Sequence, residues 1–111
     1  METTDTCTHN RIGNELRIKI TGDFDLVAVP VYRDGIIAEI GTATLDAIAF
    51  DLTETIFIDS AGLALIIELY KTKRADICVM VLKGSQAARA FDLTRLTSIV
   101  RVEVLDRPKS D

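Results

Sequence analysis

The stretch Phe57-Ile58-Asp59-Ser60-Ala61-Gly62-Leu63 decides how the rest of this chain can be interpreted. A strand-like run, 45–52, and a short polar linker precede it, and the apolar run 63–70 that follows suits a helix. Asp59 and Ser60 therefore fall where the chain passes from a sheet edge into a helix, and either side chain can cap the first amides. Because helix starts favour anions, a serine held there is either a plain cap or an acceptor for a phosphoryl group.

The composition is that of a single domain. The chain has 111 residues, of which 48% are hydrophobic and 27% are charged, so it contains enough apolar material for a core. No apolar run approaches the roughly 20 residues that span a bilayer, and residues 1–10 are unlike a secretory signal. We therefore expect a cytoplasmic protein without membrane insertion. The net charge of −4 argues against direct binding to nucleic acid, which relies on clustered Lys and Arg.

Signals for an enzyme or a metal site are weak. Cys7 and Cys78 are too few and too far apart for a zinc site or a disulfide framework. His9 is the single histidine, so a Ser-His-Asp triad would have to recruit that one residue. The nucleophile-elbow pattern also fails, because Ile58 stands where that pattern needs glycine. We expect no catalytic activity, no cofactor and no metal.

The remaining sequence alternates strand and helix patterns within one domain, 1–111, whose core is expected at about 6–105. The expected strands span residues 6–12, 15–21, 45–52, 77–82 and 99–104, and the expected helices span about 29–40, 63–70 and 86–93. In the last strand, Val100, Val102 and Val104 are expected to face inward. The strand–helix–strand order after residue 45 implies right-handed crossovers and parallel pairing. Together with the initial hairpin, this predicts an α/β fold with a mixed sheet.

The helix after Ser60 is apolar on two sides. The face expected to meet the sheet, at helical spacing, consists of Leu63, Ile66, Ile67 and Tyr70. Leu65 and Leu69 point roughly the opposite way. Either a neighbouring helix covers these two leucines, or they form an apolar patch next to Ser60 for a partner protein.

Acidic residues gather around the same place. Asp23, Asp25 and Asp59 are expected to converge with Ser60, because both segments lead from strand ends into helices. Paired carboxylates suit acid–base work or magnesium binding. However, an aspartate before a helix is more often a cap. The residues alone leave these alternatives open.

Two motifs in order resemble a known family. The stretch 57–63 resembles the Asp-Ser-Ser/Thr-Gly-Leu signature of STAS domains, as found in bacterial anti-sigma factor antagonists. Gly22-Asp23-Phe24-Asp25 is similar to that family's Gly-Glu-Leu-Asp, and the resemblance extends over 16–104. It implies a mixed sheet of four or five strands with about four helices, mostly on one face. The chain departs from the family pattern at three positions, where it has Asp23, Ala61 and Arg95.

The resemblance also implies a function. In the family, the first serine of the signature is phosphorylated by a partner that is both anti-sigma factor and serine kinase. The unphosphorylated antagonist binds that partner and frees the sigma factor, and a serine phosphatase restores the active form. By position, Ser60 is the phosphoacceptor. The expected partner-binding residues are Asp23, Asp25, Asp59, Ser60, Ala61, Gly62, Leu65 and Leu69.

A second function is consistent with the same family. STAS domains also serve as interaction subunits of ABC-type lipid-transport assemblies, in which the serine need not be modified. A weak homodimer is a further open option for either function.

Overall fold

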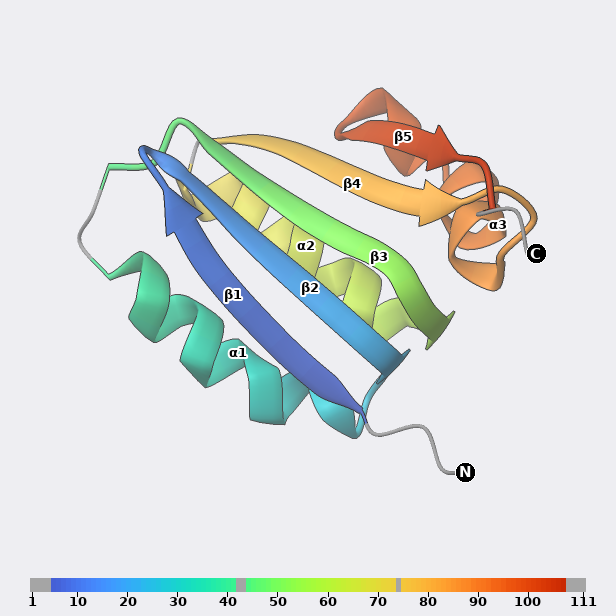
Figure 1. Cartoon of the computed structure of the whole chain (residues 1–111), viewed down its shortest axis with the longest axis horizontal. Helices are drawn as coiled ribbons and strands as arrows, with labels where there is room; N and C mark the ends of the chain where they lie inside the picture. Colours follow the sequence, from blue (N-terminus) through green and yellow to red (C-terminus); the bar gives the residue numbers. More distant parts are fainter. Residues whose placement is uncertain (1–4, 42–43, 74, 108–111) are drawn as a thin grey trace.

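A five-stranded mixed sheet with helices on one face is formed by the residues that the computed structural model describes, 5–41, 44–73 and 75–107 (Figure 1). The elements in chain order are β1 (Thr6–Ile12), β2 (Glu15–Phe24), α1 (Ala28–Ile40), β3 (Ala47–Ile58), α2 (Ser60–Lys73), β4 (Asp76–Leu82), α3 (Gln86–Leu93), the 3₁₀ helix η1 (Leu96–Ser98) and β5 (Arg101–Leu105). The predicted α/β fold is confirmed. In place of about four helices, these residues form three α-helices and one 3₁₀ helix.

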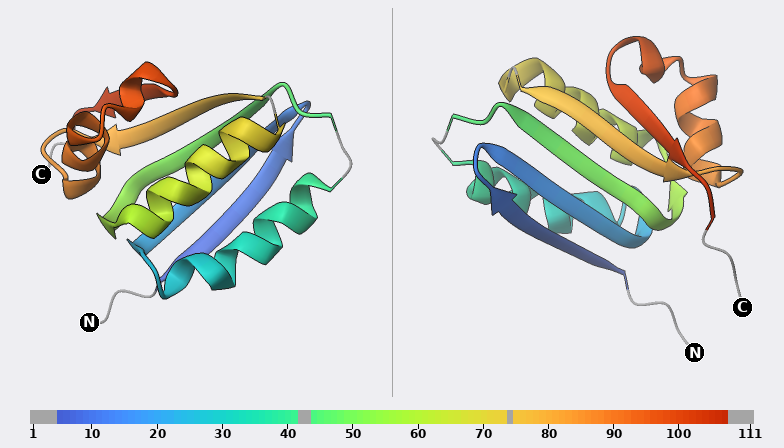
Figure 2. Two further views of the ribbon diagram at one scale, coloured as in Figure 1. Left: turned by 180° about the vertical axis from the view of Figure 1, so that it is seen from behind. Right: turned by 45° about the horizontal axis from the view of Figure 1, so that its top comes forward.

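The strands lie in sequence order across the sheet. β1 and β2 form an antiparallel hairpin, and β2 through β5 are parallel to one another. Each parallel connection runs through a helix, and α1, α2 and α3 all lie on the same face (Figure 2). The other face carries no helix in the described ranges. None of the described helices is long and apolar enough to cross a membrane.

The core lies between the sheet and the helices. Along β2, Leu16, Ile18 and Ile20 are buried toward the helices, while Arg17 points to the bare face and is exposed. Interior strands contribute Phe50 and Val79, and the ring centroids of Phe24 and Phe50 are 6.4 Å apart. Burying each large side chain is worth about 1.5–3 kcal/mol, so this layer stabilises the edge where the signature stretch begins.

The face of α2 that packs inward differs from the predicted one. Leu65 and Leu69 are 2% and 0% exposed and belong to the core, whereas Tyr70 is 40% exposed. At about 100° per residue, the buried stripe is rotated by roughly a quarter turn from the expected one. The reason is that α1 lies beside α2, where Arg33 forms a two-bond ion pair with Glu68. The prediction that Leu65 and Leu69 contribute to a partner surface is therefore wrong.

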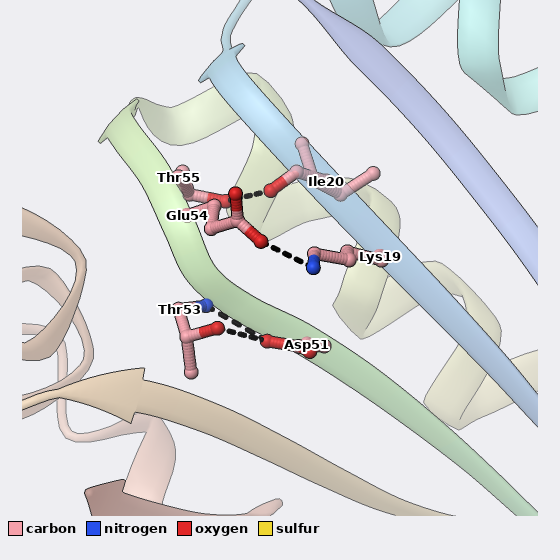
Figure 3. A network of polar contacts seen from close by, with 6 residues as sticks. All are labelled: Lys19, Ile20, Asp51, Thr53, Glu54 and Thr55. Carbon is pink, nitrogen blue, oxygen red and sulfur yellow. Dashed lines mark hydrogen bonds and ion pairs between the residues drawn. The ribbon is translucent and has the colours of Figure 1, made fainter. Parts of the chain in front are cut away.

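Strand β3 continues through residues 53–55, which the sequence presented as a linker. Its pairing with β2 shifts register twice, between Lys19 and Thr21 and between Gly22 and Asp23. At each shift β3 has one residue more than β2, as in a β-bulge, and such an extra residue bends a strand. Side chains satisfy the backbone there, as the Thr55 hydroxyl donates to the Ile20 carbonyl at 2.8 Å (Figure 3). The bend changes the direction of β3 before the turn that carries Ser60.

Nearby polar contacts complete these bulges. The Asp51 carboxylate accepts hydrogen bonds from the amide and the hydroxyl of Thr53, at 2.9 and 2.6 Å. Lys19 and Glu54 form an ion pair on the bare face (Figure 3). The pairing of β3 with β4 ends at Asp51 and Met80, so the last part of β3 leaves its neighbour.

Candidate functional site

Asp59 occupies the turn between β3 and α2 and caps the helix. Its Oδ1 accepts hydrogen bonds from the amides of Ala61 and Gly62, at 2.9 and 3.3 Å. Its Oδ2 accepts a hydrogen bond of 2.9 Å from the Leu26 amide, in the turn before α1. The Asp59 amide in turn donates to the Phe24 carbonyl at 3.4 Å. One carboxylate thus joins the two segments that the sequence predicted to converge.

Asp25 caps the neighbouring helix in the same way. Its Oδ1 accepts hydrogen bonds from the amides of Val27 and Ala28, at 3.2 and 3.0 Å. Both acids are half-buried, and both are engaged by backbone amides. Of the alternatives that the sequence left open, capping therefore accounts for Asp25 and Asp59 within the described part of the chain.

The Ser60 side chain does not cap the helix. It is the first residue of α2, its side chain is exposed, and its hydroxyl has no hydrogen-bond partner among the described residues. Because Asp59 provides the cap, the Ser60 hydroxyl is not needed to satisfy the helix start. A nucleophilic or acceptor role for this hydroxyl is sterically open.

Gly62 is buried and serves packing. A Cβ at this position would lie 2.5 Å from the Phe24 carbonyl oxygen and 2.7 Å from Cγ1 of Ile58. The first turn of α2 therefore approaches the end of β2 more closely than any side chain would permit. Because Gly62 is buried against β2, the prediction that it contacts a partner is wrong. Ala61 is half-buried and lies nearer the surface.

Gln86 anchors the turn from the side of α3. Its Oε1 accepts a hydrogen bond of 2.8 Å from the Ile58 amide, and its Nε2 donates to the Ile58 carbonyl at 2.9 Å. The amide group thus replaces the strand partner that β3 loses when it bends away from β4. The sequence analysis missed Gln86, because its distance from the signature hides the contact.

An acidic hollow of about 390 Å³ lies beside this turn, at the start of α1. Asp5, Asp23 and Asp25 line it together with Tyr32. Burial, and then the negative charges of Asp5 and other nearby groups, raise the pKa of Tyr32. The convergence predicted for Asp23 and Asp25 is thus present, and the side chains make a negative surface.

An apolar rim lies in the two segments that Asp59 joins, and it was also missed. We define it as the exposed residues Leu26, Val27 and Val31 on one side and Ile56 and Phe57 on the other. Leu26 and Val27 are 72% and 79% exposed. The run Leu26-Val27 directly after Asp25 was the available signal, but exposure depends on how α1 docks, which the sequence does not reveal.

Among the described residues, the structure brings neither His9 nor a group of metal-ligating side chains to Ser60. His9 pairs with Ile18 across the hairpin, six positions from Phe24 along β2, which corresponds to about 20 Å of strand. Its Nδ1 lies 3.8 Å from Oε2 of Glu39. Among the described residues, no group of three or more His, Cys, Asp or Glu side chains is arranged to hold a metal ion.

Comparison with known proteins places this geometry in a family. The model of the STAS domain family matches residues 4–104. No curated protein sequence matches the chain significantly. Among solved structures, the chain is similar to an anti-sigma factor antagonist from Mycobacterium paratuberculosis, with a TM-score of 0.77 and 19% identity over 90% of this chain and 86% of that one.

Two further structures share the fold. SpoIIAA in its unphosphorylated form gives a TM-score of 0.64 at 17% identity, over 93% of this chain and 90% of that chain. The Bacillus cell fate determinant SpoIIAA in its phosphorylated form gives 0.63 at 19% identity, over 94% and 93%. At such low identity the likeness shows the common fold. Because the family model covers nearly the whole chain, this protein belongs to the STAS domain family.

Proposed function

We propose that this STAS domain is an anti-sigma factor antagonist that binds an anti-sigma factor with serine kinase activity and is switched off by phosphorylation of Ser60. The observation that carries the proposal is the exposed, unbonded Ser60 hydroxyl at the start of α2, beside the apolar rim and the acidic hollow. In this role the protein is a regulator without catalytic activity, and it acts in the cytoplasm with its partner.

The proposed partner surface is the apolar rim together with the acidic hollow. Exposed leucine, valine and phenylalanine side chains gathered around one polar site are typical of a protein contact. The carboxylates of Asp23 and Asp25 suit a partner that presents Lys or Arg toward them. The buried residues Gly62, Leu65 and Leu69 support this surface from below and do not touch the partner.

Phosphorylation would act on binding more than on folding. It adds a charge of about −1.5 to −2 next to Asp59, whose carboxylate already holds the Ala61 and Gly62 amides. The helix start favours the new charge by about 0.3–1 kcal/mol, and repulsion between charges in water is of the same order. The monomer should therefore change little. Covering an unpaired charge with a partner costs several kcal/mol, which corresponds to more than a hundredfold in affinity.

Mapping the phosphate tests the assignment. Each serine kinase anti-sigma factor encoded in the same genome is incubated with ATP and either the wild-type protein or Ser60→Ala. We expect one kinase to add a single phosphate that mass spectrometry places on Ser60, and a serine phosphatase from that genome to remove it. A phosphate that persists in Ser60→Ala moves the site elsewhere. Absence of phosphate with every kinase, together with copurification of transporter subunits, favours the transport-assembly function.

Calorimetric titration with the same kinase tests the switch. Ser60→Asp is expected to weaken binding more than about a hundredfold while thermal unfolding stays within about 1 kcal/mol of wild type. Leu26→Asp should also weaken binding, and the matched control is Ile12→Asp, an exposed apolar residue in the β1–β2 hairpin at the far end of the sheet. If the Leu26 and Ile12 variants bind the kinase with equal affinity, the apolar rim is not part of the interface.

A further inference from the structure

The outer edge of β5 carries features that the Ser60 site does not explain. β5 is the last strand of the sheet and pairs only with β4 in the described part of the chain. One row of its backbone N–H and C=O groups therefore faces outward without a strand partner, which is a template for another strand. Arg107, two residues beyond β5, lines a hollow together with residues 53–56 and 84–86, away from this edge.

The edge is apolar on the helix side. A hollow of about 300 Å³ lies between β5 and α3. Ala88, Phe91, Val102 and Val104 form its apolar part, and Arg89, Asp92 and Thr97 also line it. Val104, expected to face the core, is 56% exposed, because α3 and η1 leave this side of the strand open. The opposite edge strand β1 differs, since its exposed side chains are mainly polar. Of the two edge strands, β5 is thus the one that combines unpaired backbone groups with exposed apolar side chains.

The charges on β5 suit pairing with the β5 strand of a second copy. Arg101 and Glu103 stand two positions apart on the bare face, and both are exposed. In an antiparallel pair of β5 strands related by a two-fold axis at Val102, Arg101 of each copy faces Glu103 of the other. In this register residues 101–103 of the two strands pair with each other, and Val104 extends beyond them toward residue 100, which precedes β5 and is buried. A pair centred on Glu103 would instead set two carboxylates against each other, which is unfavourable.

We propose that β5 is a self-association surface at which a second copy of this chain adds its own β5 in antiparallel register, with the two-fold axis at Val102. The second copy would continue the sheet, satisfy the outward backbone groups and cover the hollow beside Val104. Strands of five residues bury little area, so the dimer is weak. The inference rests on the sheet and its charges and does not depend on the proposed role of Ser60.

Two charge reversals give a decisive experiment. Arg101→Glu alone sets the introduced carboxylate against Glu103 of the other copy, and Glu103→Lys alone sets the introduced ammonium group against Arg101. Each single variant is therefore expected to lose self-association by about tenfold or more. An equimolar mixture of the two variants restores complementary charges between unlike copies, and the double variant Arg101→Glu/Glu103→Lys restores them between like copies. The matched control is Arg11→Glu on the opposite edge strand, which should associate like wild type.

Sedimentation equilibrium at protein concentrations up to about 1 mM measures the association, with circular dichroism to confirm that each variant is folded. The proposal is supported if wild type, Arg11→Glu, the mixture and the double variant associate while both single variants do not. A wild-type protein that stays monomeric overturns it. The proposed β5 pairing centred on Val102 is also overturned if both single variants still associate, or if the mixture of the two fails to associate.

Discussion

The carboxylate of Asp59 accepts a hydrogen bond of 2.9 Å from the backbone amide of Leu26, which lies 33 positions earlier in the chain. The same carboxylate caps α2 through the Ala61 and Gly62 amides. One side chain therefore fixes both the start of the helix that carries Ser60 and the turn that leads into α1. The site depends on Asp59 for its shape, and the neighbouring serine is left free.

Asp59→Ala is expected to lower the free energy of unfolding by about 1–2 kcal/mol, because the helix loses its cap and the Leu26 amide loses its acceptor. Asp59→Asn keeps one acceptor oxygen and should lose about half as much. Urea unfolding followed by circular dichroism measures both. The control is Asp92→Ala, an exposed acid near the end of α3. If Asp59→Ala and Asp92→Ala lower the free energy of unfolding equally, the stabilising role of the Asp59 hydrogen bonds is contradicted.

Gly62→Ala is expected to destabilise the protein by about 2 kcal/mol or more. The added Cβ would come within 2.5 Å of the Phe24 carbonyl oxygen, which is backbone and moves only with the strand. Gly35→Ala is the matched control, since it lies inside α1 with open space around its Cβ position. That variant should gain up to about 1 kcal/mol from helix propensity. Thermal unfolding of the pair measures the difference, and a tolerated Gly62→Ala would disprove the close approach.

Leu69→Ala is expected to cost about 2–5 kcal/mol, the range for a large side chain removed from a packed core. Tyr70→Ala, one position along the same helix, should cost far less because the tyrosine is 40% exposed. Chemical unfolding of the two variants compares them directly. If the costs were reversed, the buried face of α2 would be the one that the sequence pattern indicated.

Burial raises the pKa of the Cys7 thiol from 9.0 to about 11. Well below pH 9 the thiol is protonated in both the folded and the unfolded chain. As the pH rises from about 9 to about 11, the unfolded chain loses this proton and the folded chain keeps it, so the free energy of unfolding falls. Cys7→Ala should remove that part of the decrease. Urea midpoints of both proteins at pH values from about 8 to about 10.5 measure it, and identical slopes would refute the burial effect.

Much of the fold follows from local patterns. The alternation in β2 and the cap-like residues at Asp25 and Asp59 are readable because each depends on neighbours a few positions away. The phase of α2 was not readable. Its apolar residues spread over so much of the helix that only the position of α1 selects the buried face. The bulges of β3 were hidden as well, because polar residues 53–55 resemble a linker unless the register with β2 is known.

The site was predictable to the same extent. The signature stretch located Ser60, but the apolar rim and Gln86 depend on contacts between distant segments. Leu26 has the composition of a core residue and lies at the surface, whereas Leu69 was assigned to the surface and lies in the core. Composition identifies apolar residues, and only the packing of helices on the sheet decides which of them face water.

The bend in β3 has a consequence for how readily the Ser60 turn can open. Past Asp51 the strand has no ladder with β4. On that side the turn is held by the two hydrogen bonds between Gln86 and Ile58, and on the other side by Asp59. Each such bond contributes on the order of 1 kcal/mol. On the β4 side, opening the turn therefore requires breaking side-chain contacts only, while on the β2 side the ladder runs to Phe24 and Ile58. We therefore expect a substitution at Gln86 to lower the local opening energy of the turn more than the free energy of global unfolding.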